Sequence, residues 1–171
     1  MQQKFINSLY ISFIIVLFSF ASKSAEDLKS IGKFKDWETF IVTENNNKIC
    51  FAQSIPILRA PKKFERNPSR LFVSFRPSEN IEDEVSATSG YSFQKKKIVK
   101  AKSGKKTFDF FVQENFAWIL NPEAEQKFIR AMKKASRVMI IGRTDKGKQT
   151  IDHYSLMGFS NAYNAAKKNC S

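Results

Sequence analysis

The stretch Leu71-Phe72-Val73-Ser74-Phe75-Arg76-Pro77 decides the fold class of this chain. Leu71, Val73 and Phe75 stand at every second position, and this period predicts a β-strand with one face in a core. Pro77 has no backbone N–H to donate to a neighbouring strand, so it marks the end of the strand. The same period of two recurs on both sides of this stretch, which predicts a chain built mainly of strands.

Upstream, residues 38–42 and 49–53 flank Asn45-Asn46-Asn47, a turn-rich tip, and together predict a hairpin. Residues 59–69 are basic and contain Pro61 and Pro68, which predicts a loop. Downstream strands are predicted around Val85 and Ala87, over residues 97–101 and 108–112 on either side of Ser103-Gly104, and over residues 138–141 and 149–156.

Two helices complete the pattern. Asn121 can cap a helix that begins at Pro122, because its side chain accepts a backbone N–H and Pro suits the first helical position. Apolar residues at helical spacing mark the buried faces: Ala124, Phe128, Ala131, Met132 and Ala135, then Phe159, Ala162, Tyr163 and Ala166. We therefore predict a mainly β fold, an antiparallel β-sandwich or a barrel-like sheet, with two short helices, one at the C-terminus.

Residues 1–24 predict an export signal. Lys4 precedes an uncharged apolar run over residues 9–20, which is shorter than the about 20 residues that span a membrane. Small side chains predict cleavage after Ala21 or after Ser24, which N-terminal sequencing of the mature protein distinguishes. We expect a single β-rich domain over residues 25–171, located in the periplasm or outer envelope, with no transmembrane span after cleavage. A buried N-terminal helix and an uncleaved anchor are the alternatives.

Cys50 and Cys170 are the two cysteines of the chain, and both lie in the predicted mature part. An even number of cysteines in an oxidising compartment predicts a disulfide between them. The alternative is two unrelated buried thiols.

The chain is strongly basic, with a formal net charge of +13 that the loss of Lys4 and Lys23 lowers to +11. Such a charge favours anionic partners, although a genome rich in A/T codons also enriches Lys, Asn, Ile and Phe. Seven lysines lie in residues 95–106. If Val99 and Ala101 face the core, the opposite face and the turn beyond it form a possible anionic-surface contact: Lys96, Lys100, Lys102, Lys105 and Lys106.

The partner expected for these lysines is an anionic envelope lipid or polysaccharide, or an envelope protein. Nucleic acid is not expected, because no aromatic residues are interleaved with the lysines and an exported protein meets little of it. The alternative is that the lysines only protect an edge strand from aggregation.

The stretch over residues 142–149 nearly matches a phosphate-binding loop. Such a loop needs Ser or Thr directly after its lysine to hold magnesium and a helix behind it. Gln149 stands in that position, and the residues that follow resemble a strand. The stretch therefore predicts a hairpin turn rather than a nucleotide site.

The residues do not predict catalysis, and we expect no cofactor. His153 is the single histidine, and a strand would place the neighbouring Asp152 on the opposite face. A metal site needs more ligands than one histidine and two distant cysteines. The enzyme alternative is a secreted hydrolase that uses His153 or an acidic cluster, which consists of Glu79, Glu82, Asp83 and Glu84. It requires Asp83, Glu84 and His153 to share a pocket.

Three large aromatic residues, Trp37, Tyr91 and Trp118, interrupt or end apolar runs. We expect them in the core or at its edge. The alternative is a platform on which a ligand stacks, which side-by-side exposure of the rings would favour.

Several motifs in their order resemble the invasion-associated locus B family, small exported proteins of alphaproteobacteria. The matching stretches are Phe34-Lys35-Asp36-Trp37, residues 49–54, residues 71–77, Asp83-Glu84-Val85-Ser86, residues 89–93, Ala117-Trp118, residues 131–135, residues 142–162 and Cys170. Ala135 departs from an expected Gly, and Arg143 and Lys148 replace smaller residues. The resemblance implies a mainly β envelope protein without established catalytic residues. It favours a non-enzymatic interaction protein for an envelope or host-surface component.

Overall fold

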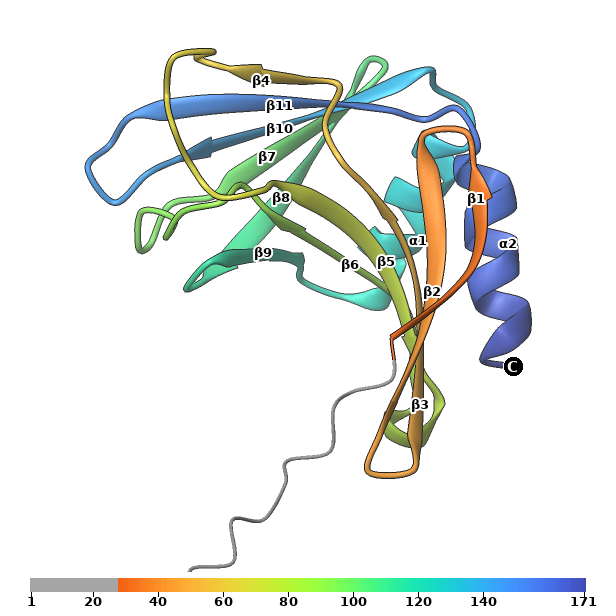
Figure 1. Cartoon of the computed structure of the whole chain (residues 1–171). Coiled ribbons are helices and arrows are strands. Elements are labelled where there is room, and N and C mark those ends of the chain that lie inside the picture. The colour runs from red at the N-terminus through yellow and green to blue at the C-terminus, as the bar shows by residue number, and fades with distance from the viewer. Residues whose placement is uncertain (1–27) are drawn as a thin grey trace, which may run out of the picture.

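Eleven strands form one continuous sheet in which every neighbouring pair is antiparallel (Figure 1). A computed structural model describes residues 28–171, so the predicted signal peptide and its cleavage positions lie outside the described residues. The strands are β1 Lys29–Phe34, β2 Trp37–Glu44, β3 Asn47–Ser54, β4 Leu58–Ala60, β5 Arg70–Arg76, β6 Ile81–Thr88, β7 Val99–Ser103, β8 Lys106–Gln113, β9 Phe116–Ile119, β10 Arg137–Arg143 and β11 Gln149–Ser155. The predicted mainly antiparallel β fold is confirmed.

The order of strands across the sheet is β1-β2-β3-β5-β6-β9-β8-β7-β10-β11-β4. The sheet curls, because its two ends contact each other. The backbone N–H of Asp36 donates to the Met157 carbonyl (3.2 Å), and Trp37 Nε1 donates to the Ser155 carbonyl (2.9 Å). The connection from β3 to β5 also crosses to the far end, where β4 pairs with β11.

Two helices cover the inner face of the curled sheet, α1 Pro122–Met132 and α2 Phe159–Asn169 (Figure 1). The predicted cap of α1 is present, since Asn121 Oδ1 accepts the Ala124 N–H at 2.9 Å. Phe128 of α1 packs against Phe108 and Phe110 of β8, at ring distances of 4.9 and 5.5 Å. The four residues predicted for the apolar face of α2 are all buried.

A disulfide joins Cys50 of β3 to Cys170 just beyond α2, with the Cα atoms 5.8 Å apart. It connects the C-terminal end of the chain to the middle of one half of the sheet, 120 residues upstream. Thr39 Oγ1 adds a second link by donating to the Ala162 carbonyl of α2 at 2.9 Å. The last helix is therefore attached to the sheet both covalently and by a buried hydrogen bond.

Two predictions were wrong in detail, and two strands were not predicted. Arg59 and Ala60 belong to strand β4 rather than to a loop, because they find backbone partners in Asp152 and Ile151 of β11. Strand β7 begins at Val99, two residues late, since Lys97 N donates to Gln94 O in a turn. Strands β1 and β9 were not predicted, because β1 is largely exposed and β9 has only four residues.

Candidate functional site

The lysine hairpin of β7 and β8 has the predicted inward face. Val99 and Ala101 are buried, while Lys100 and Lys102 between and beyond them are exposed. Lys96 does not lie on the outer face of the strand with Lys100 and Lys102, where the sequence pattern predicted it. It lies three residues before β7 at a positive φ of 60°, so it is exposed beside the strand and does not share the strand's alternation.

The turn of this hairpin opens onto a cleft of about 490 Å³ between the hairpin and α1. Its lining includes Lys105 of the turn, Lys106 at the start of β8, and the apolar residues Phe108, Ala131 and Ala135. Helix α1 contributes Lys127 and Arg130, and Lys134 follows its last turn. Five cationic side chains therefore converge on one cleft.

Sequence patterns alone did not identify the three residues that α1 brings to this cleft. Lys127, Arg130 and Lys134 are exposed and stand three or four residues apart, a spacing that places them on one face of a helix. The same spacing is typical of an ordinary solvated helix face, so nothing local distinguished them. Glu123 pairs with Lys127 at 2.7 Å, but both side chains are largely exposed, so Lys127 stays accessible.

The acidic cluster is divided by the fold. Glu79 and Glu84 both pair with Arg76, at 3.1 Å and 2.6 Å. Glu82 lies near Lys167, at 3.6 Å. Glu79 and Glu84 therefore share one arginine, and Glu82 has a different partner.

Asp83 turns inward instead, with a positive φ of 64° at an irregular position of β6. Its carboxylate accepts the Tyr163 hydroxyl at 2.7 Å. Burial is the main reason why the pKa of Tyr163 is raised. Nearby, Glu125 of α1 accepts the Val85 N–H at 3.0 Å, and burial raises the pKa of this carboxyl to about 7. These contacts attach both helices to β6.

His153 lies on β11, where it is half-buried next to Leu58 of β4 and Met139 of β10. Asp152 beside it faces the opposite side and is fully buried, as expected for adjacent strand residues. The two pockets that contain residues of the acidic cluster do not include His153. The fold thus leaves Asp83, Glu84 and His153 apart, and the hydrolase alternative lacks its required arrangement.

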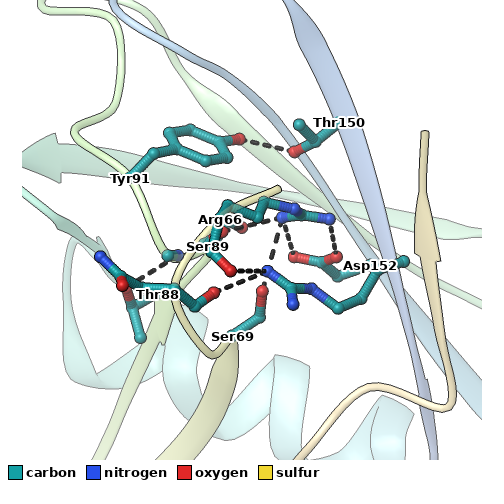
Figure 2. A network of polar contacts seen from close by, with 10 residues as sticks. Arg66, Ser69, Thr88, Ser89, Tyr91, Thr150 and Asp152 are labelled. Carbon is teal, nitrogen blue, oxygen red and sulfur yellow. Dashed lines mark hydrogen bonds and ion pairs between the residues drawn. The ribbon is translucent and has the colours of Figure 1, made fainter. Parts of the chain in front are cut away.

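Asp152 belongs to a buried polar network, shown in Figure 2. Arg66, from the segment between β4 and β5, donates through its two terminal nitrogens to the Asp152 carboxylate at 2.9 and 2.5 Å. The two side chains are 1% and 0% exposed. Arg66 Nη1 also donates to the Ser89 carbonyl at 2.8 Å, and the Tyr91 and Thr150 hydroxyls form a hydrogen bond at 2.5 Å. The network ties the long β4–β5 connection to β11.

The backbone at position 90 requires a glycine. Its φ is +79°, and a Cβ at this position would overlap the Asn67 carbonyl oxygen. Asn67 N also donates to the Gly90 carbonyl at 3.1 Å, so the two segments touch through their backbones. The segment that holds Arg66 therefore packs directly against the chain after β6.

The stretch over residues 142–149 forms a hairpin turn, as the sequence predicted. Residues 144–148 connect β10 to β11, and Thr144 N donates to the Lys148 carbonyl at 2.9 Å.

Within residues 28–171, no group of three or more His, Cys, Asp or Glu side chains is arranged to hold a metal ion. Over the same described part, neither helix has the length and apolar character needed to cross a membrane.

The three aromatic residues have different environments. Trp37 is buried at 1% exposure and packs on Phe159 of α2 at 4.8 Å, as predicted for the core. Tyr91 is half-buried beside Phe93, at a ring distance of 5.2 Å. Trp118 is also half-buried but packs against Phe116 at 5.6 Å on the outer side of the sheet. The expectation of a position in the core or at its edge therefore holds for Trp37, in the core, and for Tyr91, at its edge, whereas Trp118 is half-buried on the outer face.

Comparison with solved structures finds the same fold in a crystal structure of invasion associated protein B from Bartonella henselae. The TM-score is 0.58 with 11% sequence identity, over 82% of this chain and 96% of that chain. No family model and no curated protein sequence matches the chain. At this identity the likeness shows a shared fold, which is the fold that the sequence resemblance implied.

Proposed function

With the fold of invasion associated protein B as the premise, we propose that this chain is a non-enzymatic, exported envelope protein that binds an anionic component. The component belongs to the envelope or to a host surface. The observation that supports this proposal is the convergence of Lys105, Lys106, Lys127, Arg130 and Lys134 on one cleft. The expected export of the chain determines which anionic ligands it can meet.

The cleft is suited to a group that carries phosphate or carboxylate. Its volume of about 490 Å³ is within the usual range for ligand sites, roughly 300–1,000 Å³. Arg130 can bind two oxygens of one phosphate or carboxylate, and the lysines supply mobile point charges around it. Phe108 and Ala131 provide an apolar wall for the uncharged part of the ligand. Lys102 on the outer face adds to the attraction, whereas Lys100 beside it already pairs with Asp109 at 2.9 Å.

The residues that line the cleft are suited to binding an anion and do not indicate catalysis. A phosphate or carboxylate ligand is held by charge and hydrogen bonds, and the cleft lining contains no His, Cys, Asp or Glu side chain that acts as a nucleophile or base. We therefore place the function in binding. The shared chemistry of the ligand is a multivalent anion, such as a lipid headgroup layer or an acidic polysaccharide.

The test compares two variants with the same loss of charge. In the cleft variant, all five cationic residues are replaced with Gln: Lys105, Lys106, Lys127, Arg130 and Lys134. In the control variant, five exposed lysines that do not line the cleft are replaced with Gln: Lys29, Lys33, Lys62, Lys63 and Lys146. Binding is measured against lipopolysaccharide and against vesicles of phosphatidylglycerol in phosphatidylcholine, over a salt series.

The cleft variant is expected to lose at least about a hundredfold in affinity, because each lysine near a charged surface contributes roughly 1 kcal/mol. Its affinity should also depend less on salt than that of the parent protein. The control variant should lose much less. Equal losses in the two variants would show attraction by net charge alone, and unchanged binding by the cleft variant would refute the site.

A further inference from the structure

Aromatic rings form a continuous row across the outer face of the sheet. Phe40 of β2 stacks on Phe51 of β3 at 5.4 Å, and Phe51 contacts Phe72 of β5 at 5.9 Å. Phe72 then contacts Phe116 of β9 at 6.4 Å, and Phe116 contacts Trp118 at 5.6 Å. We call these five residues the aromatic row.

The row crosses β6 without an aromatic residue of that strand. Ser86 of β6 pairs with Phe72 on one side and with Trp118 on the other. Its small side chain is buried, at 4% exposure, and leaves room for rings from β5 and β9 to meet above it. The row therefore runs without a break from β2 across β3, β5 and β6 to β9.

The row lies on the face that the helices do not cover. The residues between its members along the strands, Ala52, Val73 and Ala117, are fully buried on the inner face. The row members remain partly accessible, and Phe116 is 37% exposed. Phe111 of β8 pairs with Trp118 and extends the row, with 42% exposure. Contiguous exposed aromatic surface of this kind is typical of an interaction site.

The row leads to the lysine hairpin. Phe111 and Trp118 line a groove of about 250 Å³ that also contains Leu120. The next strand after β8 is β7, whose outward residues are Lys100 and Lys102. Lys105 of the turn and Lys106 at the start of β8 then continue to the basic cleft. Aromatic and cationic surfaces therefore adjoin.

Two carboxylates on this face are already paired with cations. Asp109 pairs with Lys100 at 2.9 Å and Glu84 pairs with Arg76 at 2.6 Å, whereas Glu38 accepts the Ser30 hydroxyl at 2.6 Å and keeps its charge. Within residues 28–171, Lys102 and Arg70 have no carboxylate partner. These two side chains therefore present unpaired positive charge on the outer face, which complements an anionic ligand.

We infer that the aromatic row binds an extended anionic polysaccharide, which runs across the strands toward the lysine hairpin. The apolar faces of its sugar rings stack on the row, and its acidic groups reach Lys102, Lys105 and Lys106. This inference rests on the proposed function and specifies that the anionic ligand is a polysaccharide.

Two features favour a polysaccharide over a bilayer surface. Phe40, Phe51 and Phe72 are only partly exposed, so this part of the row is level with the sheet and does not project as inserting side chains must. Side chains beside the row, Gln53 and Gln113 among them, can exchange hydrogen bonds with sugar hydroxyls. A sugar presents both an apolar face and polar edges, which matches this arrangement.

The experiment uses Trp118 as a built-in reporter, because the second tryptophan, Trp37, is buried. The probes are oligogalacturonate, phosphatidylglycerol vesicles and single-stranded DNA. Oligogalacturonate should alter the Trp118 fluorescence of the parent protein and protect it from acrylamide quenching. The Trp118→Phe variant should lose this signal. If oligogalacturonate changes neither the tryptophan fluorescence of the parent protein nor its quenching by acrylamide, the inference is wrong, and no variant is needed to show it.

The Phe111→Ser, Phe116→Ser double variant should bind oligogalacturonate roughly tenfold more weakly, because it removes two stacking surfaces. Its affinity for vesicles should change less than about twofold, which is below half a kcal/mol. The matched control is Ile55→Ser, Ile57→Ser, which removes two apolar side chains that are more exposed, at 60% each, and are not members of the row; it should bind as the parent does. Circular dichroism verifies that each variant is folded.

The two proposals fail in different ways. If the cleft variant loses binding while the double phenylalanine variant keeps its affinity for oligogalacturonate, the polysaccharide inference is wrong and the proposed function stands. If the cleft variant binds every probe as the parent does, the proposed function is wrong. A double phenylalanine variant that loses vesicles or DNA in preference to oligogalacturonate identifies a lipid or nucleic-acid ligand and overturns the inference.

Discussion

Replacement of Arg66 with Met should destabilise the protein more than the loss of any exposed ion pair. The change removes both hydrogen bonds from the Arg66 guanidinium to Asp152, at 2.9 and 2.5 Å. Since the Asp152 side chain is 0% exposed, water cannot replace the lost partner. The carboxylate is then buried without either of the hydrogen bonds that Arg66 donates to it.

The expected cost is about 3–5 kcal/mol in the free energy of unfolding, the usual range when one partner of a buried ion pair is removed. A domain of this size is stable by roughly 5–15 kcal/mol, so the variant loses a large part of its stability. For about 150 residues this loss lowers the melting temperature by roughly 10 °C. Urea unfolding followed by circular dichroism measures the free energy directly.

Two further variants identify the cause. Arg76→Met breaks a similar two-nitrogen contact with Glu84, but those side chains are 21% and 18% exposed, so the cost should stay near 1 kcal/mol. The double variant Arg66→Met, Asp152→Leu removes both buried charges and should recover most of the stability. An Arg66→Met variant within about 1 kcal/mol of the parent protein would refute this reasoning.

Three other changes test the remaining parts of the fold. Cys50→Ser should lower the free energy of unfolding by about 4–5 kcal/mol in the chain-entropy model, because the disulfide closes a loop of 120 residues. Hydrogen exchange should show weaker protection of α2, and protection equal to that of the parent would contradict this prediction. Asn121→Ala removes the cap of α1 and should cost about 1 kcal/mol by urea unfolding, whereas Asn121→Ser should cost less. The pKa of Glu125 is about 7 in the folded chain against 4.5 as its ordinary value, so the folded state holds this proton more tightly. Its contribution to stability is therefore largest below pH 4.5 and is lost as the pH rises to 7; Glu125→Gln should flatten this decline, and an unchanged pH profile would contradict it.

The sequence by itself determined the elements that depend on near neighbours. The alternation of Leu71, Val73 and Phe75 predicts β5 because the side-chain period of a strand is two wherever it lies. The cap at Asn121 and the apolar face of α2 follow equally from local geometry. The inward positions of Val99 and Ala101, and the opposite faces of Asp152 and His153, were predictable for the same reason.

Only the tertiary structure decided which of these faces meet. Lys127 of α1 joins Lys105 of a hairpin because of how the helix packs on β8, and no local pattern encodes that distance. The aromatic row exists because strand order and register bring Phe51, Phe72 and Phe116 together, and a shift of one residue would turn each ring to the other face. Contacts between residues far apart in the chain depend on the whole packing of the sheet, and this is why the fold class was predictable from the sequence while the two candidate binding surfaces were not.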